Sequence, residues 1–304
     1  MNLPRLQATR FADDVILYAR SRDEAQEMLS LFQIELASMG LQLNMKKTKI
    51  LTNDTSRIDH DSISFVNIGD DFVEILRSSD CHRVLGKDVN LTQNRAQIEI
   101  AHRLRLAWAS FHKHRKALTN RDVSLRLRLR LFHSVVSPVA LFGLSCISLT
   151  DGLLRKIDVV QRRMLRCIVG WTRIPDEDWE VTMRRMRDKV NRATKLISLW
   201  PWSYYIGDRQ WLFAQRIANS DAGIWPRAIC SWEPLHLANE WAERPFRIQG
   251  RPARKWDDAI REHCSGTFDT RDWLHAASSN AWSDGRHVFA CIQLIRAGTR
   301  LPQW

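Results

Sequence analysis

The order of apolar and polar residues near the N-terminus predicts two short strands. Leu6 and Phe11 lie before the acidic pair Asp13 and Asp14, and an apolar run at residues 15–18 follows it. Short apolar segments that flank a polar turn are typical of a β-hairpin. We therefore expect an antiparallel hairpin with the two aspartates at its turn.

A change of period after the hairpin predicts an amphipathic helix over residues 22–39. Ser21 and Glu24 have the spacing of an N-terminal capping box, and Gly40 is suited to end the helix. The residues expected on its apolar face are Ala25, Met28, Leu29, Phe32, Leu36 and Met39. The hairpin is expected to pack on this helix.

Further extended segments are expected near residues 62–66, 72–76 and 83–89, separated by polar turns. Beyond residue 89 the pattern is helical. The predicted helices cover residues 96–118, 122–136, 151–169, 176–199 and 209–219. The fold class is therefore α+β and mostly α.

The content of tryptophan divides the helical part. Twelve of the 13 tryptophans follow Gly170, so we place a soft boundary there. Three regions result, at residues 1–89, 90–170 and 171–304. Tryptophan at helical spacing is usually core, although Trp200 and Trp202 are also candidates for stacking on bases.

Charge points to a polyanionic partner. The 304 residues carry a formal net charge of +12, with a pI near 9.9 and 44% hydrophobic residues. Such a balance favours phosphate contacts through counterion release, whereas the alternative is a basic protein with no such partner.

The six cysteines lack any C-x-x-C pair, which indicates reduced thiols and an intracellular location, nuclear or cytoplasmic. A zinc site from Cys230, His236, His263 and Cys264 fits no usual spacing, so no zinc is expected.

Neither secretion nor membrane insertion is predicted. The N-terminus has no apolar run of the length that a signal peptide needs. The most apolar stretch, residues 131–149, contains His133 and Pro138, which favours a buried helix pair over a membrane span.

Adjacent carboxylates at a turn repel each other unless a cation neutralises them. Mg²⁺ takes oxygen ligands and keeps waters and substrate phosphates beside one or two carboxylates, as nucleotidyl transfer requires. The alternative is an exposed turn in which Asp13 and Asp14 serve only local hydrogen bonding.

The surrounding motifs resemble the palm of a reverse transcriptase of the LINE-like, non-LTR retrotransposon kind. The string F-A-D-D at residues 11–14 is similar to the metal-binding motif C, and G-L-x-L-N-x-x-K-T at residues 40–48 is similar to motif D, in the expected order. Arg83-Val84-Leu85-Gly86 resembles the turn that leads to the thumb and helps to hold the primer.

More distant parts of the chain carry weaker resemblances. Residues 131–149 and 161–170 look like the helical region after the thumb, and residues 250–258 look like a G-R-P-x-x-x-W-x-D-D segment near the C-termini of such proteins. The resemblance implies a partial palm at 1–89, a helical thumb at 90–170 and a tryptophan-rich helical extension at 171–304.

The resemblance also implies roles for single residues. Asp13 becomes the principal metal ligand, Asp14 supports the metal site, and Phe11 and Ala12 support the hairpin. Lys47 falls on the motif D lysine, which could protonate or neutralise the departing pyrophosphate, or it is a solvated surface lysine. The implied partners are an RNA template, a DNA primer, a dNTP and two Mg²⁺ ions.

The family's third metal-binding aspartate comes from motif A, upstream of motif C, and motif B also precedes it. Only twelve residues precede Asp13, so we expect a truncated polymerase that is inactive alone. Asp70-Asp71 and Asp257-Asp258 lie in a polar turn and a helix start, where solvated side chains are expected. A degraded copy, an error in the gene model and a piece that works with a partner all remain open.

A dense basic segment at residues 101–130 is the candidate surface for nucleic acid, with one acid, Asp122, among nine bases. The bases are Arg103, Arg105, Lys113, Arg115, Lys116, Arg121, Arg126, Arg128 and Arg130. They could equally be the solvated side of amphipathic helices. An alternative for the whole chain is a non-enzymatic basic helical protein that binds nucleic acid or other proteins.

Overall fold

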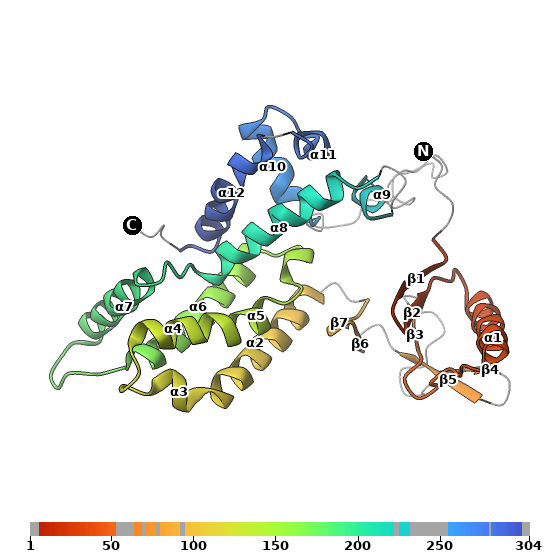
Figure 1. Cartoon of the computed structure of the whole chain (residues 1–304), viewed down its shortest axis with the longest axis horizontal. Coiled ribbons are helices and arrows are strands. Elements are labelled where there is room, and N and C mark those ends of the chain that lie inside the picture. The colour runs from red at the N-terminus through yellow and green to blue at the C-terminus, as the bar shows by residue number, and fades with distance from the viewer. Residues whose placement is uncertain are drawn as a thin grey trace, which may run out of the picture. The chain divides into compact units, whose positions relative to one another are not determined.

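The computed structural model describes residues 6–52, 64–68, 71–76, 80–91, 95–221, 225–231, 255–279 and 281–299. The chain divides into two compact units, residues 1–99 and 100–304, and each is described by itself. All described strands belong to the first unit, and the second is helical (Figure 1). The predicted fold class, α+β and mostly α, is confirmed.

The first unit contains seven described strands and one helix that lies wholly within it. Its elements are β1 (Ala8–Phe11), β2 (Asp14–Leu17), α1 (Arg22–Ser38), β3 (Lys49–Leu51), β4 (Ser64–Ile68), β5 (Asp71–Leu76), β6 (His82–Val84) and β7 (Lys87–Val89). β1 and β2 form an antiparallel hairpin, and β6 and β7 form another. β3, β5 and β4 form a sheet in which β3 is parallel to the central β5.

Helix α1 begins and ends where the sequence predicts. The Ser21 hydroxyl accepts a hydrogen bond from the Glu24 N–H at 3.1 Å, and the Glu24 carboxylate accepts one from the Arg20 N–H at 2.6 Å. At the other end, the Leu41 N–H donates to the Leu36 carbonyl at 2.8 Å while Gly40 has φ +74°, which is a Schellman motif.

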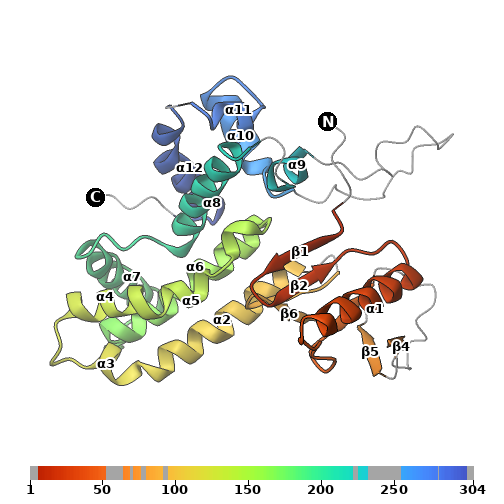
Figure 2. The same ribbon diagram turned by 45° about the vertical axis from the view of Figure 1, so that its right-hand side comes forward.

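The core of the first unit is small and lies between α1 and the three-stranded sheet (Figure 2). Leu29 of α1 packs there with Val66, Ile68 and Val73 from β4 and β5. Leu17, at the end of β2, is partly buried against the same cluster. The helix therefore packs chiefly on the sheet, and the hairpin reaches this core through the end of β2.

The second unit is a helical assembly. Its elements are α2 (Arg95–Lys113), whose first turn precedes the division between the units, α3 (Arg115–Thr119), α4 (Leu125–Val135), α5 (Ser137–Leu141), the 3₁₀ turn η1 (Leu144–Cys146), α6 (Asp151–Val169), α7 (Trp179–Lys195), α8 (Trp202–Ala218), α9 (Trp225–Ser231), α10 (Asp258–Thr267), α11 (Trp273–Ala276) and α12 (Trp282–Arg296).

Helix α8 is the centre of this unit and packs against α6, α12 and α11 (Figure 1). Trp211 of α8 stacks on Trp282 of α12 with ring centroids 3.7 Å apart, and both are fully buried. Trp202 and Trp273 are also buried. The expectation that most tryptophans are core therefore holds for these four, whereas Trp171 and Trp179 are exposed.

Helix α8 begins at Trp202, seven residues before the predicted start at residue 209. Two buried side chains of α6 bind its first turn. The Asp158 carboxylate accepts hydrogen bonds from the Ser203 N–H and hydroxyl at 2.8 and 2.6 Å, and the side-chain amide oxygen of Gln161 accepts one from the Trp202 N–H at 2.8 Å. A cap supplied by another helix leaves no signal in the local sequence.

These contacts also join the helices that lie on either side of the predicted boundary at residue 170. Helix α6 lies before that position, and α7, α8 and α12 lie after it, yet all four pack within one unit. The structure therefore places the division at residues 99 and 100 and does not separate 90–170 from 171–304.

Residues 125–146 are long and apolar enough to cross a membrane by length and composition. They form α4, α5 and η1, with Pro138 in the first turn of α5 and Gly143 at φ +68° before η1. Leu129, Phe132 and Leu144 are fully buried in the helical unit. These apolar side chains therefore pack within the protein.

Candidate functional site

The β1–β2 hairpin presents the acidic pair at its tip. Phe11 pairs with Asp14, so Ala12 and Asp13 are the two central residues of the turn. Ala12 has φ +53°, and the Arg10 guanidinium donates a hydrogen bond to its carbonyl at 3.1 Å. A positive φ at the first central position alone is the pattern of type II′ turns, which suit the twist of hairpins.

Both carboxylates point into an open environment. Asp13 and Asp14 are exposed, and neither side chain forms a hydrogen bond or ion pair with another described residue. Phe11 beside them is 67% exposed. Two free carboxylates offer the oxygen ligands that a hard divalent cation prefers, so the pair fits part of a Mg²⁺ site.

A complete metal cluster is not assembled within the described residues. No group of three or more His, Cys, Asp or Glu side chains in that part of the chain is placed to hold one ion. The other acidic pairs do not help. Asp70 lies outside the described residues, and Asp257 is buried and bonded, contrary to the expectation that it is solvated.

The motif D segment is a turn organised by one asparagine. Asn44 accepts hydrogen bonds from the Lys47 N–H, through its side chain at 3.2 Å and its carbonyl at 2.9 Å, and its carbonyl also accepts from the Thr48 hydroxyl at 3.0 Å. The Lys47 side chain is exposed. Asn and Thr at these positions therefore shape the backbone, and the lysine is left open to a partner.

The predicted L-G turn joins β6 to β7. Leu85 and Gly86 have φ of +49° and +75°, as a two-residue type I′ turn requires. Leucine is unusual in this conformation, which is strained for residues with a Cβ. Leu85 is 46% exposed, so its side chain is held outward at the end of a tight hairpin.

Two of the nine predicted phosphate-binding residues prove to be structural. The buried Arg128 donates hydrogen bonds to the Ile168 carbonyl at 2.6 Å and to the Val123 carbonyl at 3.0 Å. Burial, with the nearby Arg121 charge, lowers its pKa. Arg103 is also buried and lies over the Phe142 ring, 4.7 Å from its centroid.

The remaining seven bases are exposed on α2, α3, α4 and the segment that joins α3 to α4. They are Arg105, Lys113, Arg115, Lys116, Arg121, Arg126 and Arg130. The neighbouring acid, Asp122, is also exposed. The sequence could not tell which arginines of this segment turn inward, and phosphate binding by the seven exposed bases stays a prediction.

The consecutive residues Trp256, Asp257 and Asp258 anchor α10 to its neighbours. Trp256 donates a hydrogen bond from its indole to the Ser145 carbonyl at 2.6 Å. Asp257 accepts from the Trp273 indole at 2.9 Å and pairs with Arg261 at 2.7 Å. Residues 250–254 of this motif lie outside the described residues.

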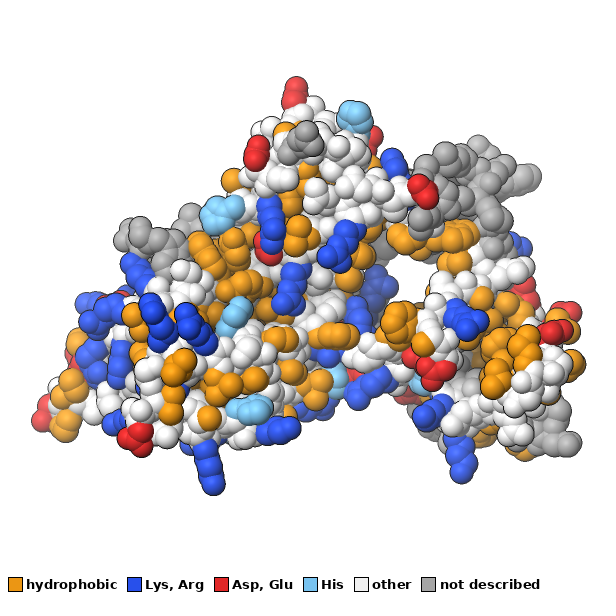
Figure 3. Space-filling view, in the orientation of Figure 1, with side chains coloured by type: hydrophobic (Ala, Val, Ile, Leu, Met, Phe, Trp, Pro, Cys, Tyr) orange, Lys and Arg blue, Asp and Glu red, His pale blue; other side chains and the backbone are white. Residues whose placement is uncertain are grey.

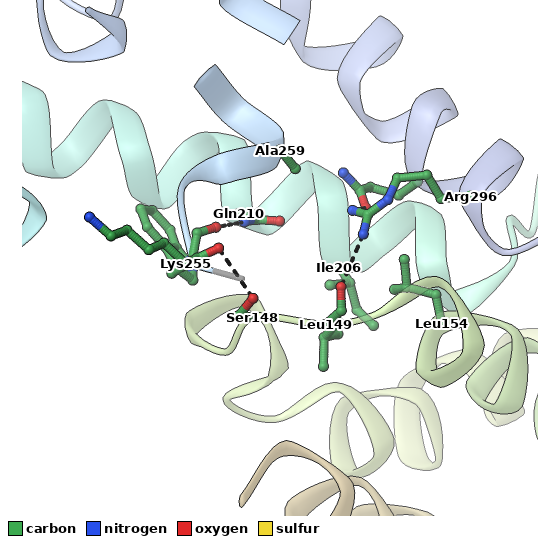
Figure 4. A pocket seen from close by; sticks show the side chains of 10 residues that line it. Ser148, Leu149, Leu154, Ile206, Gln210, Lys255, Ala259 and Arg296 are labelled. Carbon is green, nitrogen blue, oxygen red and sulfur yellow. Dashed lines mark hydrogen bonds between the residues drawn. The ribbon is translucent and has the colours of Figure 1, made fainter. Parts of the chain in front are cut away.

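A small cavity lies between these helices (Figure 4). Ser148, Gln210, Lys255 and Arg296 are among the residues that line it, and its volume of about 10 Å³ is that of one water molecule. The Ser148 hydroxyl donates to the Lys255 carbonyl at 3.2 Å, and the Arg296 guanidinium donates to the Leu149 carbonyl at 3.0 Å. The cavity is too small for a nucleotide.

Comparison with known proteins agrees with the hairpin motifs. Residues 2–88 match the reverse transcriptase (RNA-dependent DNA polymerase) family. A transposon-derived protein of Caenorhabditis elegans is 27% identical over 276 residues, which cover 90% of this chain and 88% of the nematode protein. No solved structure matches the chain significantly.

Proposed function

We propose that this chain is a reverse transcriptase of transposon origin, as the match over residues 2–88 and the nematode relative support, and that its β1–β2 hairpin is the metal-holding part of the polymerase site. Asp13 is the principal ligand in this proposal, and Asp14 supports it. A bound Mg²⁺ would stabilise the attacking and leaving oxygens of nucleotidyl transfer. In this proposal the reverse transcriptase comes from a retrotransposon of the LINE-like, non-LTR kind.

One observation carries this proposal: two adjacent carboxylates stand exposed at a hairpin tip, and neither forms an ion pair with a described cation. Like charges held together without a partner are unfavourable, and a hard cation relieves this repulsion. An ordinary polar turn would gain nothing from a second carboxylate.

The two other motifs of the first unit receive supporting roles. The exposed Lys47 would approach the departing pyrophosphate, and the Leu85-Gly86 turn would contact the primer. Their exposure supports both roles, since a solvated ammonium and an outward leucine are available to a partner. The incoming dNTP, the RNA template and the DNA primer are the partners.

The helical unit contributes phosphate contacts through the exposed set Arg105, Lys113, Arg115, Lys116, Arg121, Arg126 and Arg130. The density of cations supports this role, which needs no base recognition. The same set would serve a non-enzymatic nucleic-acid-binding protein, in which the hairpin would be an ordinary turn.

A metal titration separates the two functions. Mn²⁺ is a spectroscopic substitute for Mg²⁺ at oxygen sites, and its free ion is measured by electron paramagnetic resonance. We expect the chain to bind Mn²⁺, Mg²⁺ to displace it, and Asp13→Asn combined with Asp14→Asn to remove most of the bound ion.

The matched control is Asp176→Asn combined with Asp178→Asn, which alters two carboxylates in the segment before α7. Asp176 has φ +61°, a conformation that asparagine tolerates well. Equal Mn²⁺ binding by the wild type and the hairpin variant would reject the metal site and favour the non-enzymatic function.

A further inference from the structure

An aromatic cluster lies on the surface of the second unit, where α4, α8 and α12 meet. Its members are Trp200, Tyr204, Tyr205, His133 and His287. Trp200 stacks on Tyr204 with ring centroids 4.4 Å apart and an interplanar angle of 16°. His133 lies 5.1 Å from Tyr205, and the Tyr204 hydroxyl lies 2.9 Å from Nδ1 of His287. These residues form one continuous surface.

The cluster is accessible but firmly held. Both histidines are exposed, and the three larger rings are partly buried. The Trp200 carbonyl accepts a hydrogen bond from Gln161 at 3.0 Å, and its N–H donates to the Tyr205 hydroxyl at 3.2 Å. Trp202 fills the core beneath. Rings held in this way lose little freedom when a ligand binds.

Arginines border the cluster. Arg126, Arg130 and His133 recur at spacings of four and three residues along one exposed face of α4. Arg209, which is exposed on α8, follows Tyr205 of the cluster by one helical turn. Figure 3 shows hydrophobic side chains between α4 and α12, with Lys, Arg and His side chains around them.

The carboxylate of Asp208, which neighbours the cluster on α8, is neutralised. Both of its oxygens accept hydrogen bonds from the Arg286 guanidinium, at 2.6 and 2.9 Å. A two-pronged pair of this kind leaves little negative charge to repel an anion. The surface therefore offers aromatic rings and cations together.

We propose that this cluster binds a single-stranded nucleic acid, with unstacked bases against Trp200 and its neighbouring rings and phosphates against Arg209, Arg130 and Arg126. The inference rests on the proposed function and deepens it, because it assigns single-stranded nucleic acid to the helical unit. A duplex hides its base faces, whereas a single strand can offer them to aromatic rings. The arginines beside the rings complement the negative charge of a nucleic-acid strand, which favours such a strand over a protein partner.

The test is fluorescence anisotropy with a labelled oligouridylate of about 16 nucleotides, a length within the range of single-strand sites. The titration contains EDTA, so it does not depend on the Asp13 hairpin. We expect Trp200→Ala to weaken binding about five- to hundredfold with an unchanged salt slope. Trp200→Phe, which keeps an aromatic ring, should restore most of the affinity.

Arg209→Gln should behave differently from Trp200→Ala. Loss of one phosphate contact to a single strand lowers the log–log salt slope by about 0.7. An abasic strand of the same length should bind the wild type and Trp200→Ala equally. The matched control is Trp179→Ala, which removes a 58% exposed tryptophan of α7 and should leave affinity unchanged.

The proposal fails if Trp200→Ala binds oligouridylate with the affinity of the wild type. It also fails if Trp200→Ala lowers the affinity for the abasic strand as much as the affinity for oligouridylate. It also fails if Trp200→Ala abolishes self-association without changing oligonucleotide affinity, since the surface would then bind a second copy. If thermal unfolding shows that Trp200→Ala is not folded, the exposed ring of His133, changed by His133→Ala, decides by the same criteria. A chain that binds no Mn²⁺ at the hairpin could still bind oligouridylate through Trp200. Failure of the proposed metal site is therefore distinguishable from failure of the proposed single-strand site.

Discussion

At the scale of single residues, the role of an arginine depends on the carbonyl groups that the fold brings to it. Arg126, Arg128 and Arg130 alternate with leucines on α4 and look equivalent in the sequence. Arg128 alone reaches the C-terminal end of α6, where the helix leaves carbonyls unpaired. Its charge therefore stabilises the fold and is unavailable to phosphates.

Replacement of Arg128 by Gln should lower the free energy of unfolding by about 1.5–3 kcal/mol, because a charged donor to buried carbonyls is lost. Arg126→Gln and Arg130→Gln remove exposed charges and should change it by less than about 0.5 kcal/mol. Urea unfolding monitored by circular dichroism measures all three. Equal stabilities for the three variants would contradict the structural role of Arg128.

Asp158 is the second residue whose role only the tertiary structure reveals. Burial raises its pKa, against the hydrogen bonds from Ser203, the Arg162 charge and the Thr299 hydroxyl, which lower it. A raised pKa means that the folded protein binds this proton more tightly than the unfolded chain. The contribution to stability is then greatest at low pH and is lost as pH rises through the raised pKa.

Asp158→Asn should therefore remove one component of the pH dependence. The difference in unfolding free energy, wild type minus variant, should decrease as pH increases above about 4, the ordinary pKa of aspartate. The asparagine side chain is not ionisable and still offers an oxygen to the Ser203 N–H. Urea titrations across the acidic and neutral range measure this difference, and one that increases with pH would show that the folded state favours the carboxylate.

At the scale of the elements, the close crossing of α8 and α12 is the main contact of the helical unit. A Cβ on Gly207 would lie 2.6 Å from Cγ of Gln293 and 3.1 Å from the Cα of Ala290. Gly285 on α12 is similarly close to the Trp211 ring, at 2.8 Å. Glycine on each helix allows the backbone of one to approach the other.

Gly207→Ala should destabilise the protein by about 1–3 kcal/mol, since the two helices must separate or repack. Gly266→Ala in α10 is the control, because no atom lies within 4 Å of its added methyl group. Alanine is the better helix former, so this variant should gain about 0.5–1 kcal/mol. Thermal unfolding measures both, and a stabilised Gly207→Ala would refute the close crossing.

At the scale of the whole molecule, the candidate metal site and the basic helices lie in different compact units. The hairpin provides two carboxylates, and the described residues do not add a third to form a metal cluster. A two-metal polymerase site needs ligands for both ions to stabilise the attacking and leaving oxygens.

The 304-residue chain by itself should consequently show no template-directed incorporation of dNTPs above background. Primer extension on an RNA template with Mg²⁺ measures this, with Asp13→Ala as the matched control. Extension by the wild type that Asp13→Ala abolishes would show that another carboxylate of the chain completes the site.

Nucleic-acid binding by the helical unit should instead persist without metal. On B-DNA each phosphate contact adds about 0.9 to the log–log salt slope, so Lys113→Gln combined with Lys116→Gln should reduce it by up to about 1.8. These two exposed lysines lie outside the aromatic cluster. A titration that overlays the wild type would show that they are only solvated.

The sequence by itself determined the local features of this protein. The hairpin, the capping box and Schellman end of α1, and the change from strands to helices follow from interactions between residues close in the chain. The F-A-D-D motif and its order relative to residues 40–48 were sufficient to indicate a reverse transcriptase. Local hydrogen bonds and periodic burial leave their pattern in consecutive residues.

The tertiary structure decided what depends on distant partners. It placed the division at residues 99 and 100, started α8 at a cap from α6, and turned Arg103 and Arg128 inward. It also separated Trp202, which is core, from Trp200, which lies in the surface cluster. These outcomes depend on groups about 40 positions or more away, such as the Asp158 carboxylate for Ser203 and the Ile168 carbonyl for Arg128, so consecutive residues carry no pattern that specifies them.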